Sequence, residues 1–345
     1  MPVTAPGPGK RLSPTRRRSL FALAALSIAV LLALGLAEVA LRILDYPFRT
    51  RWTPSENALA RFDPDLGWSY VPGRTVVQRF GSQGRRIPMH FNDIGARVGE
   101  PGHRFDPAAP AVVFVGDSYT FGHGVLYEET IAGQFERNSG LPYQVVNLGV
   151  QGYGTDQALM ILQRHSRDLN PRFVVYTFLL DHVRRNDNAD RRLIFPGAKF
   201  LGTKPRFATR RDGTLEQVEK PARYEDLSQL RLWQLLQLAW AKYGPPPSMD
   251  LTRALVREMK AAVESRGATF ILVLWTNRHS TPPGKLSARL FPGIRLNVID
   301  TGAGAPADWD SYHIPGEYHP DARAYARVAS LVAEKIRELE SRSGE

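Results

Sequence analysis

The stretch that decides the fold is Ala111-Val112-Val113-Phe114-Val115-Gly116-Asp117-Ser118. Its first five residues are apolar and three of them are valine, a pattern that predicts a short strand buried inside a parallel sheet. Open α/β sheets bind their ligands beyond the carboxyl ends of the strands, so Ser118 is a candidate for chemistry. A turn in which Asp117 or Ser118 merely caps a following helix would have the same sequence pattern.

A histidine near the other end of the chain favours the chemical interpretation. His319 precedes residues 321–339, whose apolar positions recur on one face and predict the last helix. Pro320 keeps that helix from starting earlier, so His319 lies in a loop. A loop histidine taken alone is more often solvated or packed than catalytic. The combination of Ser118 and His319 is a more specific sign of catalysis, because a serine hydroxyl needs a base to become a nucleophile.

These motifs resemble those of the SGNH, or GDSL-type, serine hydrolases. Gly116-Asp117-Ser118 matches the block that carries the nucleophile, and Asn147-Leu148-Gly149-Val150-Gln151-Gly152 matches the block whose last glycine serves the oxyanion hole. His319-Pro320 matches the block that carries the base. The likeness covers about residues 65–340.

The resemblance implies both a fold and a reaction. The fold would be flavodoxin-like, with three α/β/α layers and about five parallel strands. The reaction would be ester hydrolysis without a cofactor, with Ser118 as nucleophile and His319 as base. The backbone N–H groups of Ser118 and Gly152 would bind the oxyanion.

The chain departs from the family at the acid that orients the base. The family places an aspartate two or three residues before the histidine, and this chain has Glu317 and Gly316 there. Asp308 and Asp310 in the same loop are alternatives. We favour Glu317 as the third catalytic residue, although its side chain must curl back to reach the imidazole.

A second departure concerns the oxyanion hole. The family has an asparagine after a buried strand, and here Phe178-Leu179-Leu180 is followed by Asp181. An ionised carboxylate at this position would repel the oxyanion instead of donating a hydrogen bond to it. Three outcomes are open: burial keeps Asp181 protonated, Asn186 or Asn188 supplies the donor, or the activity is weak.

The N-terminal region predicts a membrane anchor. Residues 1–18 form a basic tail with no acidic residue, and residues 20–37 carry no charge. Eighteen helical residues span about 27 Å, just enough to cross a bilayer core. We therefore expect a single-pass anchor over residues 19–45, with a cytoplasmic N-terminus and an extracytoplasmic catalytic domain. A cleaved signal peptide is the alternative, because Gly35-Leu36-Ala37 is a possible processing site.

Composition narrows the functional classes further. The net charge is +11, but five of these charges lie in the basic tail, which leaves +6 for all residues after 18. No zinc-finger spacing or RNA-binding signature accompanies this charge, so a nucleic-acid partner is not expected. The chain has no cysteine, which excludes disulfides and thiolate chemistry. No cluster with metal-ligand spacing is visible in the sequence, so we expect no metal.

The remaining pattern predicts the architecture. Residues 46–110 are expected to be an extended lead-in with a small hairpin that covers the edge of the sheet. Residues 111–342 form the hydrolase-like domain, with an insertion at about 188–247. Strands are predicted at 112–115, 144–147, 173–180, 269–275 and 295–299, and helices at 125–137, 155–168, 251–266 and 321–339. Within the insertion, the apolar helix 227–243 is either a lid over the substrate or a helix packed on the core.

The acyl acceptor is left open by the sequence. An esterase or deacylase acting on an acyl ester, with O-acetyl the favoured group, is the first hypothesis. An O-acyltransferase that modifies a cell-surface glycan is the second. A non-catalytic binding module that retains the fold is the third, because a fold alone does not confer activity.

Overall fold

A computed structural model describes residues 13–48, 59–80, 84–195, 201–226, 230–277 and 285–343 of the chain. The chain divides into two compact units. The first combines residues 1–50 with 228–244, and the second combines residues 51–227 with 245–345. The insertion predicted at 188–247 is thus divided between the units. Most of the basic tail, residues 1–12, lies outside the described residues.

An eight-stranded sheet forms the centre of the second unit, in the order β12-β11-β8-β6-β7-β5-β4-β3. Five neighbouring strands are parallel, as the sequence predicts: β12 (Asn297–Asp300), β11 (Thr269–Leu274), β8 (Asn170–Phe178), β6 (Pro110–Val115) and β7 (Gln144–Asn147). All residues of β6 from Ala111 to Val115 are buried, which explains the unbroken apolar run.

The lead-in adds three antiparallel strands to this sheet. They are β3 (Thr75–Phe80), β4 (Arg85–Phe91) and β5 (Arg97–Val98). Strand β5 pairs with β7 through Arg97 and Asn147, so the lead-in covers the edge that β7 would otherwise expose. The sequence analysis predicted only a small hairpin over the edge of the sheet. The lead-in is more extensive, because β3 and β4 are strands of the sheet itself. A separate hairpin of β1 (Ala60–Asp63) and β2 (Gly67–Tyr70) precedes them.

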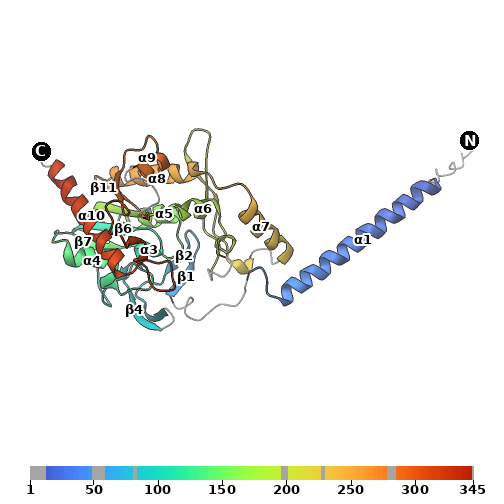
Figure 1. Cartoon of the computed structure of the whole chain (residues 1–345), viewed down its shortest axis with the longest axis horizontal. Helices are drawn as coiled ribbons and strands as arrows, with labels where there is room; N and C mark the ends of the chain where they lie inside the picture. The colour runs from blue at the N-terminus through green and yellow to red at the C-terminus, as the bar shows by residue number, and fades with distance from the viewer. Residues whose placement is uncertain are drawn as a thin grey trace, which may run out of the picture. The chain divides into compact units, whose positions relative to one another are not determined.

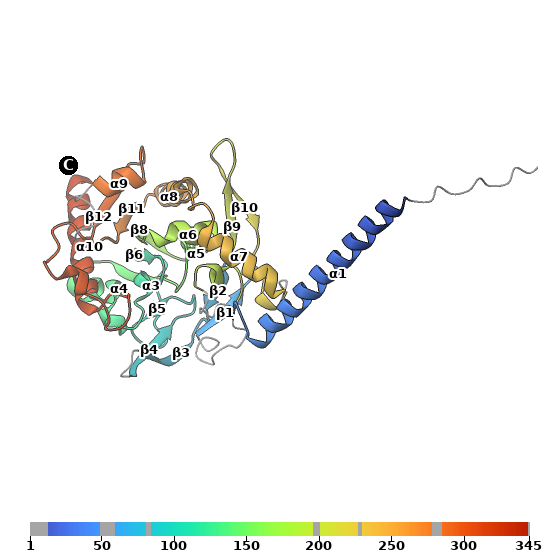
Figure 2. The ribbon, with the colours of Figure 1, turned by 45° about the vertical axis from the view of Figure 1, so that its right-hand side comes forward.

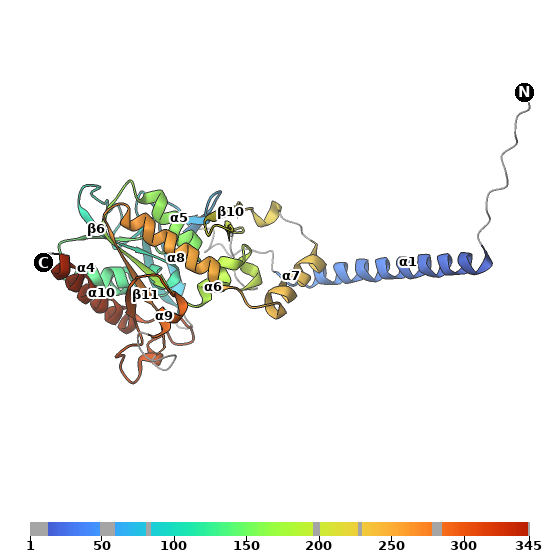
Figure 3. The ribbon, with the colours of Figure 1, turned by 90° about the horizontal axis from the view of Figure 1, so that it is seen from above.

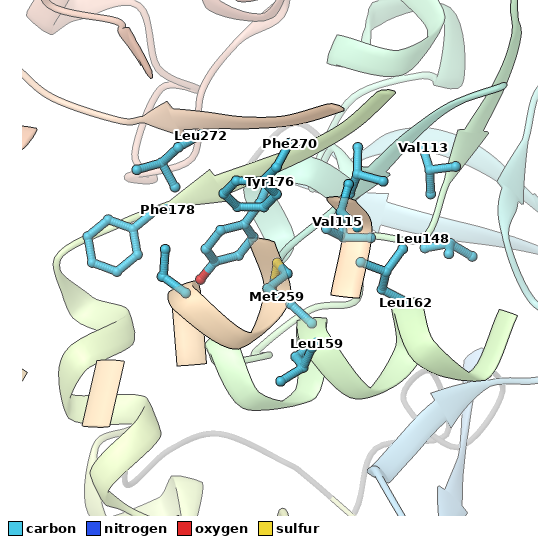
Figure 4. Close-up of a cluster of buried hydrophobic side chains, with 14 of the residues drawn as sticks. Val113, Val115, Leu148, Leu159, Leu162, Tyr176, Phe178, Met259, Phe270 and Leu272 are labelled. Carbon is cyan, nitrogen blue, oxygen red and sulfur yellow. The ribbon is translucent and has the colours of Figure 1, made fainter. Parts of the chain in front are cut away.

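Helices cover both faces of the sheet (Figure 3). On one face, α5 (Thr155–His165) and α8 (Met249–Glu264) pack on β6, β8 and β11 through the buried cluster drawn in Figure 4, which includes Leu159, Leu162 and Met259. On the other face, α4 (Ile131–Asn138) and α10 (Ala322–Ser343) pack through a second cluster. This is the predicted three-layer α/β/α arrangement.

Local signals explain where these helices begin. The Thr130 hydroxyl accepts a hydrogen bond from the Gly133 N–H at 3.0 Å, so α4 starts at Ile131 and not at the predicted Val125. A 3₁₀ turn, Tyr127–Glu129, occupies part of the difference. The Asp321 carboxylate likewise accepts from the N–H groups of Arg323 and Ala324 at the start of α10.

The second unit also contains elements that the sequence analysis did not predict. Helix α6 (Asp181–Asp187) follows β8, and the hairpin of β9 (Arg206–Thr209) and β10 (Leu215–Glu219) lies in the insertion (Figure 2). The remaining short elements are α3 (Ser118–Phe121), α9 (Lys285–Leu290) and the 3₁₀ turns Arg191–Leu193, Tyr224–Asp226 and Trp309–Ser311.

Among its described residues, the first unit contains two helices, α1 (Pro14–Ile43) and α7 (Arg231–Tyr243), labelled in Figure 1. Ser13 caps α1, with Pro14 at its first position. None of the residues of α1 is buried, and the helix is long and apolar enough to cross a membrane. Helix α7 confirms the predicted helix near 227–243, but its tryptophans are exposed and not packed in a core.

Candidate active site

The nucleophile candidate lies where β6 turns into a short helix. Gly116 has a φ of 151°, and a Cβ there would lie 2.3 Å from the Thr120 Oγ1, so the turn requires glycine. The Asp117 carboxylate caps α3 by accepting from the Tyr119 N–H at 2.9 Å. Ser118 opens α3 and is 7% exposed. Asp117 is therefore the helix cap that the alternative interpretation predicts, and Ser118 faces His319.

Ser118 and His319 meet although 201 positions separate them in the chain. The Ser118 Oγ lies 3.0 Å from the His319 Nε2. On the far side of the ring, the Glu317 Oε2 lies 3.5 Å from the His319 Nδ1. Ser118, His319 and Glu317 thus lie in the order that the predicted roles require, with Glu317 in the place considered also for Asp308 and Asp310, and the roles themselves stay predictions.

Backbone contacts hold the histidine loop in this position. The His319 carbonyl accepts from the Ile314 N–H, and the Ile314 carbonyl accepts from the Glu317 N–H, each at 2.9 Å. Gly316, between them, has a φ of 82°. The Tyr119 hydroxyl also donates to the Tyr318 carbonyl at 2.9 Å, which ties the loop to the helix of the nucleophile.

The environment of His319 suits a base. Burial lowers its pKa below the ordinary value, while the nearby carboxylates of Asp117 and Glu317 act in the opposite direction. A lowered pKa leaves the imidazole neutral at neutral pH, so its Nε2 can accept the proton of Ser118.

A second histidine, which the sequence analysis did not identify, shares the same acid. The His123 Nε2 lies 3.4 Å from the Glu317 Oε2, and the rings of His123 and His319 lie 4.1 Å apart at a tilt of 30°. The Gln151 side-chain amide hydrogen-bonds to the His123 Nδ1. Burial lowers the pKa of His123 to about 3, and the nearby His319 and Arg97 side chains act in the same direction. His123 is therefore neutral and can donate its Nε2–H to Glu317.

This group is also an arrangement that could hold a metal ion. The ligand atoms of His123, Glu317 and His319 lie within 4.8 Å of one another. Sequence spacing could not reveal the cluster, because His123 comes from the loop after α3 and the other two from the loop before α10. An ion there would occupy the His319 Nδ1, the nitrogen that faces Glu317.

Two backbone amides are available for an oxyanion. Within the described part of the chain, the N–H groups of Ser118 and Gly152 donate to no other group. Gly152 has a φ of 79°, and its carbonyl accepts from the Arg191 Nε at 2.7 Å. The Val150 N–H donates to the Gly116 carbonyl at 3.1 Å, which holds the two blocks together.

Asp181 is engaged in an ion pair. Its Oδ2 lies 2.7 Å from the Arg185 Nε, and the Nη1 of the same guanidinium lies 2.6 Å from the Asp117 Oδ2. A carboxylate that pairs with a guanidinium accepts hydrogen bonds and does not donate one to an oxyanion. The oxyanion role of Asp181 stays a prediction.

The alternative asparagine donors are already engaged. The Asn186 amide donates to the hydroxyls of Thr155 and Thr252, and its residue is fully buried. The Asn188 amide donates to the Arg184 carbonyl at 2.9 Å. Arg185 pairs with both Asp117 and Asp181. The sequence analysis missed Arg185 because these two partners follow different strands.

Asp117 is buried next to the nucleophile and remains ionised. Burial alone would raise its pKa, but the Arg185 guanidinium and the His182 ring outweigh that effect and hold the pKa below its ordinary value. The His182 Nε2 lies 3.2 Å from the Asp117 Oδ2, and its Nδ1 lies 2.8 Å from the Tyr176 hydroxyl. A buried polar network thus supports the nucleophile turn.

We compared the chain with known families, curated proteins and solved structures. No family model matches the sequence, and no curated protein matches it either. Among solved structures, the chain is similar to the lipase/acylhydrolase from Enterococcus faecalis, with 14% identity, a TM-score of 0.39 and coverage of 66% of this chain and 96% of that one.

Two further structures give similar values. A GDSL-like lipase from Bacteroides thetaiotaomicron has 13% identity and a TM-score of 0.39, over 66% of this chain and 88% of that one. A member of the lipolytic protein G-D-S-L family from Veillonella parvula has 14% identity and a TM-score of 0.36, over 68% of this chain and 100% of that one. These TM-scores are too low to support a function. Any function proposed for the chain therefore rests on the geometry of the site.

Proposed function

We propose that this chain is a serine esterase of the SGNH type, anchored in a membrane by α1, that cleaves an acyl ester outside the cytoplasm. The observation that carries the proposal is the 3.0 Å contact between the Ser118 Oγ and the His319 Nε2, with Glu317 at the other ring nitrogen. A nucleophile, a base and an orienting acid in this order are what acyl transfer requires.

The reaction follows from these positions. The Ser118 oxygen attacks the ester carbonyl while its proton moves to the His319 Nε2. The N–H groups of Ser118 and Gly152 stabilise the negative charge on the carbonyl oxygen. His319 then protonates the departing alcohol, which leaves an acyl group on Ser118. Attack by water, activated by the same histidine, releases the acid and restores the serine.

The acyl acceptor distinguishes the related hypotheses. Water as acceptor makes the protein an esterase or deacylase, with an O-acetyl ester as the favoured substrate. A sugar hydroxyl would make it an O-acyltransferase of a cell-surface glycan. Water is the acceptor we propose, because it needs no further binding site.

The anchoring part of the proposal rests on α1. The helix has 30 residues and a mean hydropathy of 2.6 over its most apolar window, and its side chains are not buried within the protein. At 1.5 Å per residue it is about 45 Å long, more than the thickness of a bilayer core. Arg16, Arg17 and Arg18 at its N-terminal end favour a cytoplasmic N-terminus.

A fluorophosphonate probe and an acetyl ester test the catalytic part on the full-length protein. We expect the probe to label Ser118, and p-nitrophenyl acetate to release free acetate. Absence of labelling would favour a non-catalytic binding module, and transfer of acetate to an added glycan would favour the transferase. A chelator should leave turnover unchanged, because the Ser118–His319–Glu317 group needs no metal.

Membrane extraction tests the anchor separately. The full-length protein should stay in the membrane fraction after salt and carbonate washes. A soluble product with a new N-terminus near Glu38 would show that residues 20–37 belong to a cleaved signal peptide.

A further inference from the structure

Helix α7 exposes a stripe of large apolar side chains. The stripe recurs every three or four residues, so that its members lie on one face of the helix. Each member is between 53% and 77% exposed: Leu230, Trp233, Leu236, Trp240 and Tyr243. Soluble surfaces seldom collect so many large apolar side chains on one face, and such a patch marks an interaction site.

The opposite face of α7 is held by the rest of the first unit. Arg231 and Gln234 are buried there, at 6% and 2% exposure. The Arg231 guanidinium donates to the Phe48 carbonyl at 2.6 Å and to the Asp45 carboxylate at 2.9 Å. These hydrogen bonds hold the inner face of α7 against the rest of the first unit, and they thereby fix the orientation of the apolar outer face within this unit.

The start of α7 is bonded directly to the end of the apolar span. The Glu38 carboxylate accepts hydrogen bonds from the N–H groups of Arg231 and Leu232, each at 3.0 Å. Glu38 is also the first charged residue after the uncharged run 20–37. A carboxylate is expensive inside a bilayer, so Glu38 marks the level at which α1 leaves the hydrocarbon. The cap places the first turn of α7 at that same level.

We propose that α7 lies in the interfacial layer of the membrane that α1 crosses, with its outer face against lipid. This inference rests on the proposed anchoring. Tryptophan and tyrosine favour this layer, because their rings are apolar and their N–H or O–H groups still reach water. A 13-residue helix is about 20 Å long. Lying along the membrane surface over that length, α7 would restrain the direction in which the chain leaves the membrane.

Quenching of tryptophan fluorescence tests the proposal on the full-length protein in phosphatidylcholine vesicles. Bromine atoms near the top of the acyl chains quench tryptophans in the interfacial layer. We expect brominated vesicles to quench the parent more than plain vesicles do, and the Trp233→Phe/Trp240→Phe double variant to lose at least half of that quenching. Trp309→Phe is the matched control, because Trp309 is 4% exposed in the other unit and should keep the quenching.

The outcomes separate this inference from the anchor and from the enzyme. Protein that floats with the vesicles but shows equal quenching in the double variant and the parent would overturn the role of α7 and leave the anchor standing. Protein that does not float would overturn both, whereas probe labelling of Ser118 reports on the enzyme alone.

A second copy of the chain is the other possible partner for this face. The chain has no cysteine, so Trp240→Cys introduces a single reactive thiol. We expect this variant to stay monomeric in vesicles under mild oxidation. Disulfide-linked dimers in at least half of the protein would assign the face to another copy and overturn the membrane proposal.

Discussion

The surroundings of Ser118 and the outer face of α7 depart from the usual distribution of residues in opposite directions. Beside the serine, charged side chains are buried: Asp117 is 0% exposed and Arg185 is 7% exposed. On α7, Trp240 is 71% exposed. Folded proteins usually bury apolar groups and expose charged ones, and each departure costs free energy unless something compensates for it.

The compensation differs between the two regions. Beside Ser118, partners inside the protein provide it, because Arg185 contacts both Asp117 and Asp181. On α7, large side chains such as Trp233 and Trp240 stay exposed within the described structure, so we look for the compensation in the surroundings. Buried charge therefore indicates a site completed by the fold, and exposed apolar surface indicates a site completed by something outside it.

The largest loss of activity is expected when Ser118 or His319 is replaced. Ser118→Ala and His319→Ala should each lower kcat by about 10⁴-fold or more, because nucleophile and base act as one unit. The double variant should be little worse than either single one. Ester turnover and circular dichroism of the purified proteins measure both points. Parent-level activity in Ser118→Ala would contradict the serine mechanism.

Removing the buried Arg185 guanidinium should strongly lower the stability of the fold. Arg185→Met leaves two carboxylates without their cation and should lower the free energy of unfolding by about 3–5 kcal/mol. Arg206→Met is the matched control, since Arg206 pairs with Glu219 at the surface and an exposed pair is worth about 0–1 kcal/mol. Urea unfolding compares the two. Equal costs would mean that the network beside Ser118 is not supporting the fold.

Glu317→Gln should affect both rate and pH dependence. We expect kcat to fall by about 10²- to 10³-fold, less than the loss of about 10⁴-fold known for a buried orienting aspartate. The Glu317 charge raises the pKa of His319 against the lowering effect of burial. Its removal should lower that pKa further, so the acidic limb of kcat/KM moves to lower pH. Asp310→Asn is the control, and a larger effect there would reassign the acid.

Asp181→Asn should have a smaller effect and the opposite sign. If Asp181 borders the oxyanion, replacing the carboxylate by an amide removes a repulsion and adds a donor, so kcat should rise. The gain should stay below the range of about 10²- to 10³-fold that one such donor supplies. Steady-state kinetics measure it. Loss of activity would show that the ion pair with Arg185 is needed in the reaction.

The smallest effect is expected on α7. Trp240→Ala should change the free energy of unfolding by less than about 0.5 kcal/mol in detergent, because no cavity forms at an exposed side chain. Phe173→Ala, in the buried core of β8, should cost about 3–5 kcal/mol. Thermal unfolding compares the two variants. A large loss in Trp240→Ala would mean that this face is packed against protein.

Much of the fold could be predicted because its signals are local. Five short apolar runs gave the five parallel strands, and one-sided apolar stripes gave α5, α8 and α10. The start of α4 was placed too early, because Thr130 caps the helix and a 3₁₀ turn, Tyr127–Glu129, precedes it. The β3–β4 extension was underestimated, since strand pairing depends on which edge is left open.

The sequence by itself identified Ser118 and His319 as candidates, because one follows a strand end and the other precedes a helix, and the resemblance to the SGNH hydrolases added Gly152. Only the tertiary structure decided that His123 shares Glu317 with His319 and that Arg185 joins Asp117 to Asp181. Those contacts arise where loops from distant strands meet, and no spacing within the chain records them. The apolar stripe of α7 was equally visible in the sequence, but apolar periodicity reports only that one face avoids water. Whether protein or lipid covers that face depends on where the helix lies.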